Sequence, residues 1–119
     1  MIVSRRVTVR TTIRQIGDVS VIDLSGRITI GEGGVMLREQ VRELLESHQR
    51  HIVLNLRHVP YMDSAGILEM VNCHKLAKER GGAVKLLQPA EKVRDVLQIT
   101  RFDDVFETYQ DERDAIASF

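Results

Sequence analysis

The sequence is poor in aromatic residues and in cysteine. Of its 119 residues only 4% are aromatic and none is tryptophan, so a core has to be built from Val, Ile, Leu and Met. Cys73 is the single cysteine, which excludes an intrachain disulfide. It falls in an apolar helical pattern, and this favours a small buried side chain over a reactive thiol.

The chain also lacks an excess of either charge. Its 17 basic and 17 acidic residues cancel, whereas a protein that holds nucleic acid through phosphate contacts usually carries a basic surplus. No apolar run approaches the roughly 20 residues of a membrane span. Residues 1–6 become charged too early for a signal peptide. We therefore expect a cytoplasmic protein that binds neither nucleic acid nor membrane directly.

What the chain does have is an alternation of strand and helix patterns, without internal repeats or linkers. Two β-branched segments separated by Gly17-Asp18 predict an antiparallel hairpin. The nearly continuous apolar run of residues 51–56 suits a strand that is covered on both faces. Strands are predicted at residues 7–15, 19–24, 51–56, 83–87 and 105–106, and helices at 35–47, 64–80, a segment opened by Pro89, and 111–118, with Asp111 as N-cap.

This order of elements predicts one α/β domain over residues 1–119, with its core at about 7–117. The fold is expected to be a mixed β-sheet of four to five strands packed against about four helices. The hairpin should lie at one side of the sheet, because its two strands pair locally.

The junction before the second long helix carries the richest local signal. It reads Tyr61-Met62-Asp63-Ser64-Ala65-Gly66. Either Asp63 or Ser64 can cap the helix, and Ala65 and Gly66 permit a close approach to the backbone. A phosphate on Ser64 would stand in the positive field of the helix N-terminus. The residues alone leave open whether Ser64 is modified or only caps the helix.

Other candidate sites are weak. Gly31-Glu32-Gly33-Gly34 lacks the Gly-Lys-Ser/Thr ending of a phosphate-binding loop, and we interpret it as a flexible loop near a partner surface. The four histidines have no spacing typical of a metal site. No nucleophile with a base at a suitable spacing is evident. We therefore expect no enzyme activity, no metal and no cofactor.

Five segments together resemble the STAS domain family. Residues 59–66 resemble the family signature, an apolar stretch that ends in Asp-Ser-Ser/Ala/Thr-Gly. The resemblance extends, in the same order along the chain, to residues 24–27, 79–86, 93–100 and 102–106. It covers about residues 7–117, which is nearly the whole sequence.

The resemblance implies a function in bacterial regulation. In the anti-sigma factor antagonists of this family, the serine that matches Ser64 is phosphorylated by the anti-sigma factor, a serine kinase of the histidine-kinase-like ATPase type. The unphosphorylated antagonist binds that kinase and frees the sigma factor. The partner-binding surface is then expected to comprise Tyr61, Met62, Asp63, Ser64, Ala65 and Gly66, together with Gly31, Glu32 and Gly33.

The alternative is a constitutive interaction or scaffold module in which Ser64 only caps the helix. A weak homodimer is compatible with either reading. Two departures from the family pattern bear on the partner surface. Thr29 stands where many members have an acidic residue, and Arg101 stands where many have glycine, at the turn before Phe102.

Overall fold

The computed structural model describes residues 9–29 and 31–119, except for the side chain of Glu32. It contains one sheet and four helices over that part of the chain. In chain order the elements are β1 (Val9–Ile16), β2 (Val19–Gly26), α1 (Glu32–Glu46), β3 (His51–His58), α2 (Ser64–Glu79), β4 (Ala83–Leu87), α3 (Glu91–Ile99), β5 (Thr108–Tyr109) and α4 (Glu112–Ala117).

The sheet is mixed, and its strands lie in the order of the sequence, from β1 to β5. β1 and β2 form the antiparallel hairpin, with Ile16 opposite Val19 across a turn in which Gly17 has a φ of 60°. β2, β3, β4 and β5 are all parallel. The α/β class, the five-stranded mixed sheet, the four helices and the hairpin at one side confirm the expectation from the sequence.

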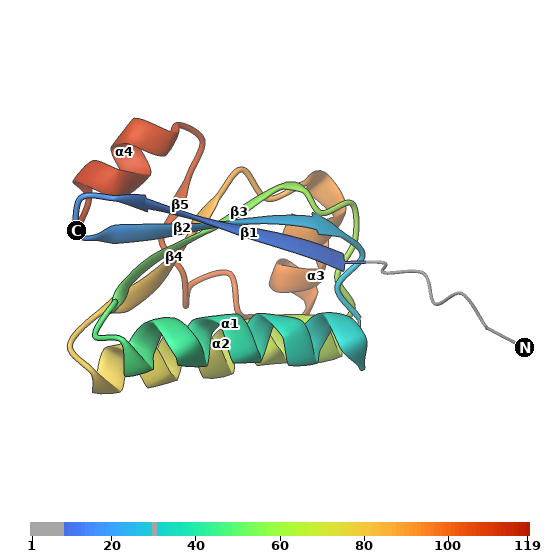
Figure 1. The fold of residues 1–119 in the computed structure, drawn as a ribbon. Coiled ribbons are helices and arrows are strands. Elements are labelled where there is room, and N and C mark those ends of the chain that lie inside the picture. Colours follow the sequence, from blue (N-terminus) through green and yellow to red (C-terminus); the bar gives the residue numbers. More distant parts are fainter. Residues whose placement is uncertain (1–8, 30) are drawn as a thin grey trace, which may run out of the picture.

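The helices cover the two faces of the sheet unequally. α1, α2 and α3 lie on one face and α4 alone on the other (Figure 1). The larger apolar cluster lies under the three helices and is built mainly from Leu, Ile, Val and Met, as the shortage of aromatic residues required. The smaller cluster beneath α4 joins Val19, Val21, Val53, Leu87 and Ala115.

Some boundaries differ from the prediction. α1 begins at Glu32 and not at Val35, so Gly33 and Gly34 lie within its first turn. The edge strand predicted at 105–106 is wrong: Phe106 is buried in the larger cluster, and the chain pairs with β4 only at Thr108 and Tyr109. The predicted start of the first strand at residues 7 and 8 lies outside the described residues.

His74 ties α2 to the sheet. Its Nδ1 accepts a hydrogen bond from the backbone N–H of Val84 on β4, at 3.1 Å, and its ring lies 5.3 Å from the ring of Phe106. Burial lowers the pKa of His74, and the nearby Lys78 lowers it further. The folded protein therefore keeps this imidazole neutral, with Nδ1 as an acceptor.

The lowered pKa of His74 predicts that the stability of the fold depends on pH. Because the folded-state pKa of His74 lies below its ordinary value of about 6.5, the unfolded chain takes up the proton first as the pH falls. The free energy of unfolding should therefore decrease between about pH 7 and pH 5. Urea unfolding across this range would measure the slope, and His74→Asn should flatten it. An equal slope in the two proteins would contradict the assignment.

Candidate functional site at the start of helix α2

The loop between β3 and α2 is fixed by the segment that follows β2. Ile28 and Met62 form an isolated parallel bridge. The N–H of Ile28 donates to the carbonyl of Tyr61 at 3.0 Å, and the N–H of Asp63 donates to the carbonyl of Ile28 at 3.3 Å. Two hydrogen bonds to one buried residue thus hold the backbone immediately before the helix.

Asp63 is the residue that caps α2. Its backbone is extended, with φ −84° and ψ 177°, and its Oδ1 accepts a hydrogen bond from the N–H of Gly66 at 2.8 Å. This geometry is that of a side-chain N-cap, which satisfies one of the otherwise unpaired N–H groups of the first turn. Ser64 is the first helical residue and is exposed. Capping is therefore not the role of Ser64.

Gly66 allows a close approach, but the approaching group belongs to the same chain. A Cβ at this position would lie 2.5 Å from the carbonyl oxygen of Ile28. Gly66 is buried, so its lack of a side chain serves the junction between α2 and the segment after β2. Ala65, half-buried, is the neighbouring small residue that stays nearer to the surface.

Met62 was expected on the partner-binding surface, but its side chain points into the core. Met62 is 0% exposed and belongs to the larger apolar cluster. An apolar residue before a helix cap packs inward here because its backbone pairs with Ile28 in the interior. Tyr61 is half-buried, and the guanidinium of Arg27 lies 5.0 Å from the centre of its ring. Tyr61 therefore remains near the surface, stacked against a cation.

The glycine-rich run is not a loop. Gly31, with φ 98°, is the N-cap position of α1, and Glu32 begins the helix. Gly33 is buried, and a Cβ there would lie 3.1 Å from the Cα of Ile28. Of the predicted partner residues in this run, the exposed Gly31 lies at the surface and Gly33 does not.

Both helix starts lie at the same end of the molecule, where the first turn of α1 sits beside that of α2 (Figure 1). Between the two turns is a hollow of about 180 Å³. Arg38 on α1 and Glu69 on α2 form an ion pair of 3.4 Å at this hollow. Its lining consists of Thr29, Gly31, Gly34, Val35, Arg38, Ala65 and Glu69.

Thr29 thus lines the hollow at the position where many STAS domains carry an acid. Arg101, the second departure, takes the left-handed backbone that a glycine adopts easily, with φ 63°. Its N–H donates to the carbonyl of Gln98 at 3.1 Å, and the N–H of Phe102 donates to that of Leu97 at 2.9 Å. The tight turn is therefore kept without glycine, at the cost of backbone strain.

Two surface residues near Ser64 were not predicted. Leu68, one turn along α2 from Ser64, is 49% exposed, and Val35 in the first turn of α1 is 40% exposed. In the sequence, Leu68 belongs to a wide apolar stripe of α2, together with Ile67, Val71, Leu76 and Ala77. The signal was the width of that stripe, since one helix face cannot bury so many adjacent positions.

A second polar cluster lies on the opposite face of the sheet. Arg14 on β1 donates to Asp23 on β2 at 2.6 and 2.9 Å and also to Glu112 on α4. Asn55 on β3 donates to Asp23 at 2.8 Å. The hydrogen bond from Arg14 holds the pKa of Asp23 below its ordinary value. Arg14 thus bridges two carboxylates, one on β2 and one on α4, and fastens α4 to the sheet.

Several other site types find no support in the described part of the chain. No group of three or more His, Cys, Asp or Glu residues there is arranged to hold a metal ion. Cys73 is buried, and burial raises the pKa of its thiol to about 12, so it is protonated at neutral pH. None of the helices described combines the length and apolar character that a membrane crossing needs.

The comparison with known families and proteins gives one consistent result. The STAS domain model matches residues 10–115. The anti-sigma-B factor antagonist of Bacillus subtilis is 30% identical over 86 residues, which cover 72% of this chain and 77% of that protein.

Three solved structures of two proteins extend the comparison. A Thermotoga maritima protein provisionally described as an anti-sigma factor antagonist is 26% identical, with a TM-score of 0.79, and covers 90% of this chain and 92% of its own. The antagonist SpoIIAA is similar in its unphosphorylated form, with a TM-score of 0.76, 18% identity and coverage of 92% and 98%. Its phosphorylated form, from Bacillus, has a TM-score of 0.70, 19% identity and coverage of 91% and 97%. The likeness to SpoIIAA shows a shared fold.

The close contact at Gly66 predicts the effect of adding one methyl group. Gly66→Ala should lower the free energy of unfolding by about 1–3 kcal/mol, because its Cβ meets a backbone oxygen that cannot rotate away. Gly34→Ala is the matched control. Its Cβ would find no atom nearer than 3.7 Å, so this variant should be neutral or slightly more stable. Urea unfolding of both variants tests the difference, and equal stabilities would contradict it.

Proposed function

This chain belongs to the STAS domain family, and we propose that it acts as an anti-sigma factor antagonist whose partner binding is switched off by phosphorylation of Ser64. Its partner would be an anti-sigma factor that is itself a serine kinase, of the histidine-kinase-like ATPase type. The protein would act by binding, in the cytoplasm, without catalytic activity or cofactor of its own.

The observation that carries the proposal is the division of roles between Asp63 and Ser64. Asp63 caps the helix with its own carboxylate, while Ser64 presents its side chain at the surface. In the scaffold alternative, Ser64 is present because it caps the helix. Asp63 makes the cap instead, so capping does not explain the serine at position 64. An exposed hydroxyl at the first turn is accessible to a kinase and to a partner.

The local field is compatible with a phosphate. A phosphoserine carries about −1.5 to −2 charges at neutral pH. The N-terminus of a helix of 16 residues supplies free N–H groups and roughly half a positive charge. The fold can therefore tolerate the modification, while a partner that packs flush on this surface meets both its bulk and its charge. One relative in fold supports this reading, since SpoIIAA has been solved with and without phosphate.

The apolar part of the contact surface is assigned to Leu68 and Val35. Both are about half exposed, and Leu68 lies one turn from Ser64 on α2. A partner that covers this surface would remove both side chains from water, and the burial of their apolar area would contribute to the affinity. They take the place of Met62, whose side chain is in the core.

Replacing Ser64 with Ala should leave the fold intact and lock binding on. The free energy of unfolding should change by less than about 0.5 kcal/mol, because an exposed residue without a capping role is replaced. Incubation with the partner kinase and ATP should add one phosphate to the wild-type chain, located at Ser64 by mass spectrometry, and none to the variant. Ser47→Ala, at an exposed serine after α1, is the control and should be modified normally.

Titration of the partner then tests the switch itself. The Ser64→Asp variant should bind more weakly than the wild type but more strongly than the phosphorylated chain, since Asp carries one charge and fewer acceptor oxygens. If phosphorylated and unmodified chains bind with equal affinity, the switch is refuted and the constitutive scaffold function replaces it.

Replacing Leu68 with Ser should weaken partner binding at little cost in stability. Truncating an apolar anchor in an interface costs about 1–2 kcal/mol or more of binding free energy, which is at least several-fold in Kd. Leu76→Ser is the matched control, because Leu76 is 38% exposed on the same helix but lies three turns from Ser64. Isothermal titration of both variants should show the loss for Leu68 alone. Equal losses would place the interface elsewhere.

A further inference from the structure

The two edges of the sheet differ in length. At one edge β5 contributes only Thr108–Tyr109, whereas at the other β1 contributes the eight residues Val9–Ile16. Figure 1 looks toward this longer edge, with β1 in front of the other strands and α1 below it. The unpaired N–H and C=O groups of an edge strand can pair with a further strand. The edge formed by β1 is therefore a candidate interface.

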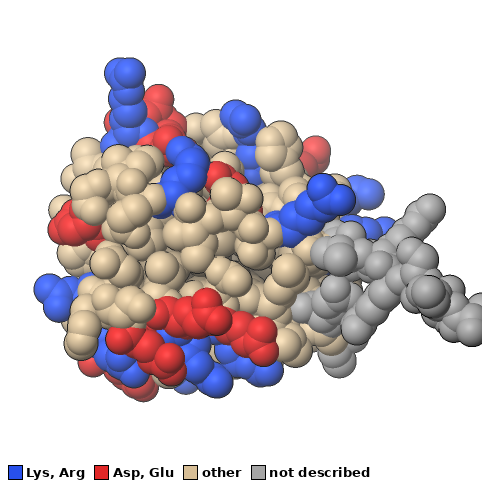
Figure 2. All heavy atoms as spheres, viewed as in Figure 1, with Lys and Arg blue, Asp and Glu red and all other residues tan. Residues whose placement is uncertain are grey.

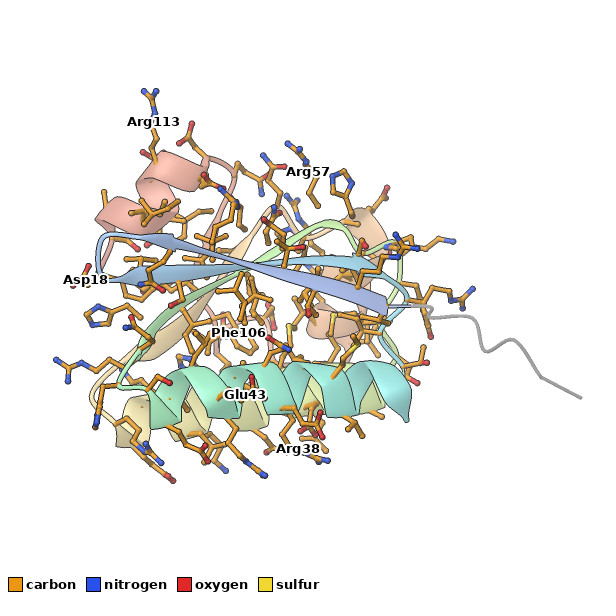
Figure 3. The ribbon with its side chains drawn as sticks, viewed as in Figure 1. Asp18, Arg38, Glu43, Arg57, Phe106 and Arg113 are labelled. Carbon is orange, nitrogen blue, oxygen red and sulfur yellow. The ribbon has the colours of Figure 1, made fainter. Side chains whose placement is uncertain are left out.

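β1 does not carry the features that commonly prevent such pairing. Protected edge strands contain proline, lysine or a β-bulge, or they are very short. The sequence of β1, VRTTIRQI, contains neither proline nor lysine, and its eight residues pair with β2 in unbroken register. Arg14 is directed over the sheet face toward Asp23 and Glu112. Mainly uncharged side chains cross the middle of this surface (Figure 2), and charged ones gather below it on α1, where Glu43 lies (Figure 3).

The hairpin determines which backbone groups of β1 point out of the sheet. Ile16 and Val19 flank a two-residue turn, so they form a hydrogen-bonded pair. Hydrogen-bonded pairs alternate along an antiparallel ladder, and residues 10, 12 and 14 therefore also bond to β2. The N–H and C=O groups of the residues between them point toward the open edge. A strand added at this edge would bond to residues 9, 11, 13 and 15.

Ile13 is the apolar side chain near the centre of this open ladder. It lies on the face of the sheet that the three helices cover, since it stands opposite Ile22 of the larger apolar cluster. It is nevertheless 39% exposed, because no strand lies beyond β1. A neighbouring strand that set an apolar side chain opposite Ile13 would remove this surface from water.

We infer that a second copy of this chain occupies the edge, through antiparallel pairing of β1 with β1 of the other copy. A two-fold axis perpendicular to the sheet relates the two copies, so the same residues serve both sides of the interface. Ile13 stands opposite its own copy at the axis, and Thr11 stands opposite Gln15. About six backbone hydrogen bonds form in this register. The two five-stranded sheets become one continuous sheet.

Charge selects this register over its neighbours. The side chains must keep their faces, so the nearest alternatives centre the pairing on Thr12 or on Arg14. The first alternative sets Arg10 opposite Arg14, and the second sets Arg14 opposite its own copy. Like charges directly opposite each other are destabilising. With Ile13 at the axis, Arg10 instead stands opposite Ile16, which is 36% exposed. The strand therefore complements itself without a charge conflict, which is the reason for assigning a second copy.

Sedimentation equilibrium tests the association. One pair of short strands is a small interface, so monomers should convert to dimers at concentrations of roughly 10 µM to 1 mM. Ile13→Lys should raise the dissociation constant about tenfold or more, because it sets two positive charges opposite each other at the axis. Ile99→Lys is the matched control, since Ile99 is 80% exposed on α3 and should leave the constant unchanged. Thermal unfolding confirms that both variants are folded.

Oxidative cross-linking tests the register. Ile13→Cys places two thiols opposite each other with their Cα atoms about 5.5 Å apart, which a disulfide can span. Thr12→Cys is the matched variant on the other face. Its copy lies diagonally at about 7–8 Å, too far for a disulfide. Ile13→Cys alone should therefore give a covalent dimer, and the wild type, whose Cys73 is buried, should give none.

Three results would overturn the inference. The first is a chain that sediments as a monomer over the whole concentration range. The second is cross-linking of Thr12→Cys that equals that of Ile13→Cys. The third comes from hydrogen exchange: if the amides of residues 11, 13 and 15 become protected only when another protein is added, the edge binds a foreign strand and not a second copy.

Discussion

The arrangement of the candidate site depends on the backbone of Ile28. This single buried residue donates to Tyr61, accepts from Asp63, and packs against both Gly33 and Gly66. One short segment after β2 thereby sets the positions at which α1 and α2 begin. Gly66 is required because a Cβ there would lie 2.5 Å from the carbonyl oxygen of Ile28, while at Gly33 the nearest atom, the Cα of Ile28, would lie at 3.1 Å. The candidate site at the starts of α1 and α2 therefore depends on contacts with the carbonyl and the N–H of Ile28.

The layout of strands and helices was accessible from the sequence because its signals are local. The two β-branched segments and the Gly17-Asp18 turn predict the hairpin from adjacent residues, and this prediction was confirmed. The short strand at the sheet edge was not predictable in this way. Val105 and Phe106 look like a strand, but the buried position of Phe106 against the helices decides the path of the chain.

The candidate site was predictable in place but not in orientation. Sequence reasoning located the junction at Ser64 and offered two residues as the cap. It could not tell which side chain would fold back, since both have the required oxygen. Nor could it show that Met62 points inward, because an isolated bridge between distant residues, Ile28 and Met62, leaves no periodic pattern in the sequence.

The cap on α2 has a consequence for how such proteins change over generations. Since Asp63 satisfies the helix terminus, the residue at position 64 is under little selection for folding. If Ser64 is modified as proposed, a single substitution there removes the modification site without a loss of stability that a second mutation must repair. Under that proposal, a regulated protein and a permanently active one would differ by a single codon, and the intermediate would fold equally well.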